Sequence, residues 1–132
     1  MERTAINPWA WAKSLGYDQA HLVVGPARHL HCAGQTAVDP DGRPVGGDMA
    51  RQMEVALDNL EAVLAAAGMG LSDVVRLGVF ATDVDAALAA WGTLAARLGR
   101  AGASPPTTLL GVTRLAVPGL SIELEATAAA AC

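Results

Sequence analysis

Two segments of the chain carry apolar residues at the spacing of an α-helix, in which one face repeats every three or four positions. The first begins after Asp48, whose carboxylate can accept hydrogen bonds from a first helical turn, and ends before Gly68, a natural helix stop. Its predicted apolar face is Met49, Met53, Leu57, Leu60, Leu64 and Ala67. The second runs from near Asp83 to Gly99, and its predicted apolar face is Val84, Leu88, Trp91, Ala95 and Leu98. Each helix has one side to bury, and a β-sheet is its natural partner.

Short runs that are β-branched, or that alternate between apolar and polar residues, predict strands. The predicted strands are 4–6, 21–24, 29–33, 74–81, 107–112 and 120–128. Gly25-Pro26 predicts a hairpin between the second and third of these strands, and Pro118-Gly119 predicts a turn that pairs the last two. A further turn is predicted at Asp39-Pro40-Asp41-Gly42.

The last predicted strand alternates regularly, so one of its faces is expected to be buried and the other polar. Its polar positions are Ser121, Glu123, Glu125 and Thr127. The order of the elements predicts one α+β domain over residues 1–132, with a mixed sheet and both helices on one face. No third long helix is predicted to cover the other face, so a neighbouring subunit is expected there.

Composition strengthens that expectation. The chain is 52% hydrophobic and only 17% charged, whereas an average soluble domain is about 25% charged. A membrane-spanning helix would need about 20 consecutive apolar residues, and the apolar run 62–71 is shorter and is interrupted by Gly68 and Gly70. The N-terminus does not have the pattern of a signal peptide either. Burial between subunits therefore explains the apolar surplus better than a membrane does.

Charge and cysteine content narrow the possible partners and compartments. The net charge is −4, and the nine Lys and Arg residues are scattered, which disfavours nucleic-acid binding because that requires clustered cations. The cysteines, Cys32 and Cys132, fit no metal or redox spacing. A buried, inert thiol is expected at Cys32, and both cysteines suit a reducing cytoplasm.

Three groups of residues have candidate chemistry, and each has a plainer alternative. His29 and His31 would share one face of a strand and could form part of a metal site, although a half-exposed pair on an edge strand is the favoured interpretation. Glu123 and Glu125 could do acid–base work, whereas a carboxylate on a solvent-facing strand is more often only solubilising.

The third group is aromatic, because Tyr17 lies close in sequence to Trp9 and Trp11. These rings form either a hydrophobic plug for the N-terminal arm or the wall of an apolar pocket. The chain has no phosphate-binding glycine loop, no paired-histidine metal motif and no nucleophile-elbow serine. No metal or cofactor is therefore expected.

Several segments, taken in order and spacing, resemble one known family. They are Gly16-Tyr17-Asp18-Gln19-Ala20, Cys32-Ala33-Gly34-Gln35, Gly47-Asp48, residues 59–68, Asp73-Val74-Val75, Phe80-Ala81-Thr82-Asp83 and residues 122–126. Together they span most of the chain and resemble the RidA (YjgF/L-PSP) family of reactive-intermediate deaminases.

The resemblance implies a chorismate-mutase-like fold and a homotrimer whose sheets pack into a central barrel. It further implies clefts between subunits that bind small carboxylic acids, in which many members hydrolyse enamines and imines to ketoacids and ammonia. The family's tyrosine corresponds to Tyr17, the glycine that contributes its backbone to Gly34, and the glutamate that positions water to Glu123.

One departure from the family pattern bears on the substrate. Deaminating members have an arginine in a Pro-x-Arg-Ser/Thr motif that grips the substrate carboxylate, but this chain has Pro105-Pro106-Thr107-Thr108, with Thr107 in place of that arginine. Leu109 takes the position of a nearby family cysteine. A hydroxyl offers one neutral hydrogen bond where arginine offers a charged, planar fork. Imines derived from amino acids are therefore not expected to be good substrates.

Two functions remain open at this stage. The first is an imine or enamine hydrolase in which Glu123 activates water, with Tyr17, Gly34, Thr107 and Leu109 contacting the substrate. The alternative is a trimer that binds a metabolite without turnover. An endoribonuclease is disfavoured by the acidic charge.

Overall fold

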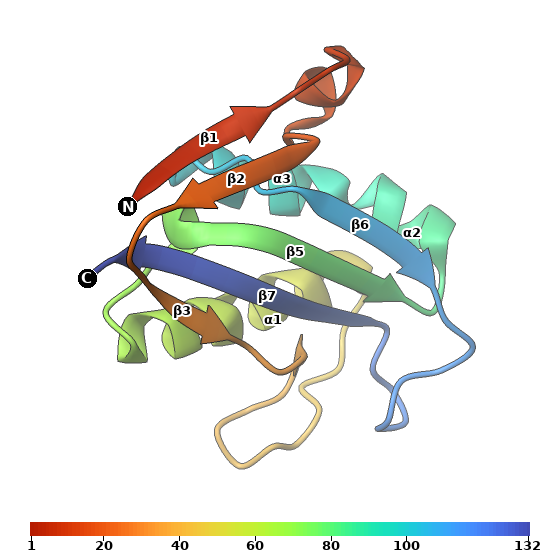
Figure 1. Ribbon diagram of the computed structural model, residues 1–132. Helices are drawn as coiled ribbons and strands as arrows, with labels where there is room; N and C mark the ends of the chain where they lie inside the picture. The colour runs from red at the N-terminus through yellow and green to blue at the C-terminus, as the bar shows by residue number, and fades with distance from the viewer.

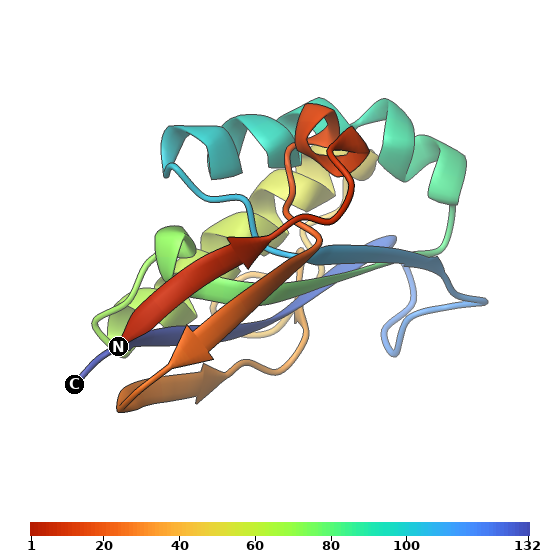
Figure 2. The ribbon, with the colours of Figure 1, turned by 45° about the horizontal axis from the view of Figure 1, so that its top comes forward.

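The fold has two layers, a twisted β-sheet and a layer of helices packed on one of its faces (Figures 1 and 2). A computed structural model describes all residues, 1–132. The strands are β1 (Glu2–Ile6), β2 (Ala20–Val24), β3 (Ala27–His31), β4 (Gln35–Thr36), β5 (Val74–Ala81), β6 (Thr107–Gly111) and β7 (Ile122–Ala131). The helices are α1 (Met49–Ala66), α2 (Val84–Ala89) and α3 (Trp91–Arg100), with 3₁₀ turns η1 (Trp11–Leu15) and η2 (Leu71–Asp73).

The main sheet is mixed, as predicted. Its strand order is β3-β7-β5-β6, and the short β4 also pairs with β7. β5 and β6 are parallel because α2 and α3 cross over between them, whereas β7 runs antiparallel to β5 and β3. β1 and β2 form a separate two-stranded ribbon beside this sheet (Figure 1).

Both predicted strand pairings of neighbours in sequence are wrong. β2 pairs with β1 and β3 pairs with β7, so the Gly25-Pro26 link carries the chain from one sheet to the other instead of closing a hairpin. Gly25 has a φ of +91° at this change of direction. β6 and β7 do not pair either, because they lie on opposite sides of β5. The turn at residues 39–42 is confirmed by a 2.9 Å hydrogen bond from the Gly42 N–H to the Asp39 carbonyl.

α1 follows the prediction closely. The Asp48 carboxylate caps it by accepting a 2.9 Å hydrogen bond from the Arg51 N–H. Gly68, with a φ of +70°, follows its C-terminal end. Its buried residues are Met49, Gln52, Met53, Ala56, Leu57, Leu60 and Leu64. They form the centre of the main core, between the helices and the sheet.

The second helical segment departs from the prediction in two ways. It is divided at Ala90 into α2 and α3, and its inward side chains are Ala87, Leu94 and Leu98. Leu88, predicted to be buried, is 55% exposed. The alanines of this segment are nearly equivalent at neighbouring positions, so hydrophobicity alone does not fix which of them faces the core. The stripe is therefore rotated, and Leu88 points away from the core.

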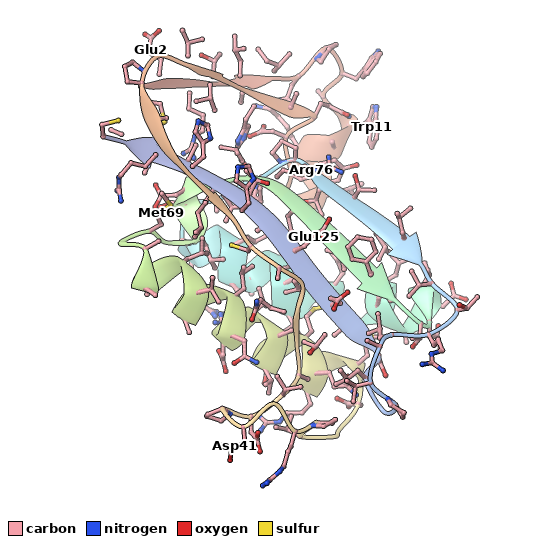
Figure 3. All side chains as sticks on the ribbon, turned by 60° about the horizontal axis from the view of Figure 1, so that its bottom comes forward. Glu2, Trp11, Asp41, Met69, Arg76 and Glu125 are labelled. Carbon is pink, nitrogen blue, oxygen red and sulfur yellow. The ribbon has the colours of Figure 1, made fainter.

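The face of the sheet away from the helices is open and carries polar side chains (Figure 3). Along β7, Ile122, Leu124 and Ala126 are buried toward the helices, while Glu123 and Glu125 point to the open face, as the alternation predicts. Arg76 on β5 lies on the open face as well, near Glu125 (Figure 3).

Large apolar side chains remain exposed elsewhere on the surface. Those more than half exposed are Trp9, Trp11, Leu15, Leu22, Val24, Leu88 and Leu110. None of the helices is both long enough and apolar enough to cross a bilayer.

Candidate functional site

An apolar cavity of about 350 Å³ opens on the helix side of the molecule, at the edge formed by β6. It is lined by Leu15, Tyr17, Leu88, Trp91, Thr107 and Leu109. These side chains come from η1 and the loop after it, from α2 and α3, and from β6. The volume is at the lower end of the roughly 300–1,000 Å³ typical of small-molecule clefts.

Tyr17 is placed at the cavity by its neighbours in the N-terminal arm. Gly16 ends η1 with a φ of +88°, which turns the chain sharply before Tyr17. The Trp11 ring meets the Tyr17 ring edge to face, with centroids 6.3 Å apart and planes at 85°. Trp11 and Trp9 do not line the cavity themselves, and their side chains are 58% and 62% exposed.

Asp18 ties the Tyr17 loop to the segment that leads into Thr107. Its carboxylate accepts hydrogen bonds from the Ser104 hydroxyl at 2.7 Å, from Asn7 Nδ2 at 2.8 Å and from His21 Nε2 at 3.0 Å. Its backbone N–H also donates to the Ser104 carbonyl at 3.0 Å. Burial raises the pKa of Asp18, but the hydrogen bonds from Ser104, His21 and Asn7 outweigh it and hold the pKa below its ordinary value. This network fixes the two walls of the cavity relative to each other.

Thr107 has no proton to offer a ligand. Its hydroxyl donates to the Pro105 carbonyl at 2.8 Å, and a carbonyl oxygen can only accept, so the single hydroxyl proton is already used. The neighbouring position in the same orientation, Leu109, is apolar and packs against the main core. No side chain lining the cavity carries a charge.

Gly34 and Glu123 form a second, separate contact. A Cβ atom at Gly34 would lie 2.5 Å from Glu123 Cδ, so only glycine lets the two segments approach this closely. Glu123 sits where β4 pairs with β7, opposite Thr36. The ion pairs of the chain join His21 to Asp18 and Arg97 to Asp58 and Glu61, so the Glu123 carboxylate is paired with no cation.

Strand register shows that these two groups lie on opposite faces of the sheet. Leu109 is the partner of Val79, which is buried toward the helices. Glu123 is the partner of Phe80, the next residue along β5. Successive residues of a strand point to opposite faces, so Thr107 and Leu109 face the helix side and Glu123 faces the open side. Within one chain the cavity and the carboxylate cannot contact the same small molecule.

The histidine pair lies on β3, an edge strand of the main sheet, as predicted. The rings of His29 and His31 stack with centroids 6.4 Å apart, and both side chains are exposed on β3. No cluster of three or more His, Cys, Asp or Glu residues suited to a metal ion is present.

A family model described as Endoribonuclease L-PSP matches residues 12–130. The chain belongs to the RidA/YjgF (L-PSP) family. A solved structure of a Rid-family protein of unknown function, YyfB from Yersinia pestis, is 37% identical and superposes with a TM-score of 0.84 over 97% of this chain and 98% of that one. The mixed sheet with helices on one face is therefore the fold of this family, as predicted.

Other members of the RidA/YjgF family differ in name and in coverage. The RutC family protein YjgH of Escherichia coli is 30% identical over 95% of this chain and 93% of its own length. A 2-iminobutanoate/2-iminopropanoate deaminase of Escherichia coli is 30% identical over 56% of this chain and 63% of its own length. Protein DfrA of Myxococcus xanthus is 40% identical over 64% of this chain and 65% of its own length. These last two matches span less than two thirds of the relatives' lengths.

Several residues at the candidate site had no signal in the sequence. Leu88 and Trp91 were assigned to the core, yet they line the cavity. Asp18 and Ser104 are 86 positions apart, so only the folded chain shows their hydrogen bond. The one feature of the sequence that could have drawn attention to Asp18 is its position directly after Tyr17.

Proposed function

We propose that this chain hydrolyses the C=N bond of an imine or enamine-derived imine in a cleft shared by two subunits of a homotrimer. The observation that carries the proposal is the division of the site by the sheet, with the binding cavity on one face and an unpaired carboxylate on the other. A second copy of the chain could bring its Glu123 to the cavity of the first. Membership of a family that includes an imine deaminase supports the reaction class.

Surface composition supports the assembly. Seven large apolar side chains are more than half exposed, among them Leu15 and Leu88 at the mouth of the cavity. Large apolar side chains left in water are a common feature of surfaces that a partner covers. The open face of the sheet has no covering layer in the single chain, which leaves it free to meet other copies (Figure 3).

The proposed chemistry needs only water and a base. Glu123 accepts a proton from water as the water oxygen bonds to the imine carbon and the C=N π pair moves to nitrogen; Glu123 then delivers this proton to the nitrogen, which gives a carbinolamine. Glu123 then takes the proton of the carbinolamine hydroxyl and passes it to the nitrogen, so that the C–N bond breaks, the C=O bond forms and ammonia leaves. Gly34 leaves room for the carboxylate, and Tyr17 orients the substrate. A positioned general base such as the one proposed for Glu123 typically contributes about 10²–10⁴-fold in rate.

The absence of a cation at the cavity argues against 2-imino acids as preferred substrates. A carboxylate in this cavity would lose its hydration and meet no positive charge, which costs several kcal/mol in a buried site. The resemblance to the family implies an arginine at the position of Thr107 in its deaminases, so this chain is proposed to act on a different class of imine.

A release assay tests the reaction class. Ammonia is measured after mixing the protein with freshly generated imines of three kinds, namely 2-iminopropanoate, an aliphatic ketimine and an aryl aldimine. We expect release above the uncatalysed rate for at least one of the two neutral imines, with 2-iminopropanoate the slowest. Equal background rates for all three imines would overturn the hydrolase proposal. Light scattering checks the assembly, and a monomer would overturn the trimer.

The second candidate is a trimer that binds a small metabolite without turnover. The observation that favours it is the cavity itself, whose lining side chains contain no acid or base other than the phenol of Tyr17. Saturable ligand binding with no product would decide for it. The name of the family model also raises a ribonuclease, but the net charge of −4 makes contact with a phosphate backbone unfavourable. Two free cysteines fit a reducing compartment, and we propose the cytoplasm.

A further inference from the structure

We infer that the cavity selects a neutral ligand that combines a compact hydrophobic group with an N–H donor. This inference rests on the proposed function for the location of the site and adds the chemical class of what binds there. It comes from three features of the lining side chains: their polarity, their charge and the direction of one hydrogen bond.

The hydrophobic part of the ligand follows from the walls. Leu15, Leu88, Trp91 and Leu109 surround the space, and Leu15 and Leu88 are each 55% exposed in the single chain. An apolar group placed among them removes both its own surface and theirs from water. A cavity of about 350 Å³ accommodates a ring or a branched aliphatic group, not an extended chain.

The requirement for an N–H donor on the ligand comes from Thr107. Because its hydroxyl proton is held by the Pro105 carbonyl, its oxygen can only accept a hydrogen bond from a ligand. An N–H group satisfies that oxygen, whereas a carboxylate oxygen would face it lone pair to lone pair. Tyr17 and Trp91 also line the cavity, and each side chain has one hydrogen-bond donor. A neutral imine, with its N–H beside an apolar substituent, matches both requirements.

The exclusion of anions follows from charge. The lining has no Lys, Arg or His, so a bound carboxylate would have no counter-ion. Isolated charges are strongly disfavoured in apolar surroundings. Neutral ligands of the same shape pay no such penalty, so the site discriminates by charge before it discriminates by shape.

Isothermal titration with matched stable probes tests the inference on the intact protein. Cyclohexanecarboxamide has the ring and the N–H donor, cyclohexyl methyl ketone has the ring and only an acceptor, cyclohexanecarboxylate is the anionic isostere, and acetamide lacks the ring. We expect the carboxamide to bind at least tenfold more tightly than the carboxylate, with the ketone between them and acetamide undetectable. A carboxylate that binds as tightly as the carboxamide would overturn the inference, and so would a failure of all ring-bearing probes to bind.

Two variants locate the binding. Leu88→Ala, on the cavity wall, should weaken the carboxamide at least fivefold, while Val45→Ala, a valine 41% exposed before α1 and outside the cavity, should leave its affinity unchanged. Thr107→Val keeps the shape of the side chain and removes the acceptor, so it should erase the preference for carboxamide over ketone. An unchanged preference in a folded Thr107→Val protein would contradict the role of the Thr107 oxygen.

The binding and turnover measurements distinguish failure of this inference from failure of the hydrolase proposal. If the carboxamide binds as expected but no imine is hydrolysed, the inference stands and the hydrolase proposal fails. If imines are hydrolysed but the carboxylate is the preferred probe, the hydrolase proposal stands and the inference fails.

Discussion

The two faces of the sheet differ in almost every property that matters for function. The helix side holds a cavity lined by apolar side chains and no charge, whereas the open side holds Glu123 and Glu125 in strict alternation with the core. The cavity is suited to bind, and the carboxylate face is suited to move a proton. Because the sheet separates them within one chain, the proposed hydrolase site would be complete only with Glu123 from a second copy.

The largest effect is expected when the carboxylate of Glu123 is removed. Glu123→Gln should lower imine turnover by about 10²–10⁴-fold, because the amide cannot accept a proton from water. The affinity for a neutral probe should change less than about twofold, since affinity depends on the cavity. Glu125→Gln, two positions along the same face, is the matched control and should retain turnover. Full turnover in Glu123→Gln would contradict the role of this carboxylate as the base.

Introducing a positive charge into the cavity should shift its preference from neutral imines to anionic ones. Thr107→Arg introduces the charged fork that the resemblance to the family implies for its deaminating members, so hydrolysis of 2-iminopropanoate should rise at least tenfold. Binding of cyclohexanecarboxamide should weaken, because the guanidinium both occupies space and needs an anion. Turnover of the two imine classes, measured side by side, checks the exchange. A wild type that already prefers 2-iminopropanoate would show that another group holds the carboxylate.

The contact between Gly34 and Glu123 can be tested by adding one methyl group. Gly34→Ala places a Cβ 2.5 Å from Glu123 Cδ, so the carboxylate must move and turnover should fall roughly tenfold to a hundredfold. Gly92→Ala is the control, because its Cβ meets nothing within 4 Å and alanine favours the helix. Full activity in Gly34→Ala would mean that the position of Glu123 is not critical.

The smallest effect is expected from weakening the hydrogen bonds of Asp18, which connect the two walls of the cavity. Asp18→Asn weakens the hydrogen bonds from Ser104 and His21 and should lower the free energy of unfolding by about 1–3 kcal/mol. The pKa of Asp18 is lower in the folded state than in the unfolded chain, so its contribution is present above the unfolded value and is lost as pH falls through the folded one.

Denaturant unfolding of wild type and Asp18→Asn between pH 7 and pH 2 measures this dependence. The difference between them should be largest near pH 7 and should narrow below about pH 4, where the unfolded carboxyl becomes protonated. Asp41→Asn, in the exposed turn at 39–42, should match wild type throughout. A difference that grows toward acid pH would have the wrong sign for a carboxyl with a lowered pKa.

The local sequence pattern predicted where helices and strands lie along the chain, but not which strands pair with each other. α1, β5 and the alternation of β7 follow directly from periodicity and from Asp48 and Gly68 as boundaries. The strand pairings were wrong because pairing depends on non-local partners, such as β7 against β5, which turn residues do not encode. The phase of the second helical segment was wrong because its many alanines leave the apolar face undefined.

The candidate site was predictable in its parts and not in its arrangement. Motif resemblance selected Tyr17, Thr107 and Leu109, which the fold brings to one cavity, and Gly34 and Glu123, which it brings into contact. Their placement on opposite faces depends on register, which only the folded chain shows. The roles assigned to these five residues remain predictions.

Subunit mixing tests most directly the claim that cavity and carboxylate join between copies of the chain. Glu123→Gln lacks the base, and Leu88→Glu places a charge in the cavity, so each is expected to be inactive alone on a neutral imine. After co-refolding at equal ratio, about a quarter of the shared clefts would combine an intact cavity with an intact Glu123. We predict turnover near that fraction of wild type. Mixtures as inactive as the parent variants, with mixed trimers present, would contradict the shared site.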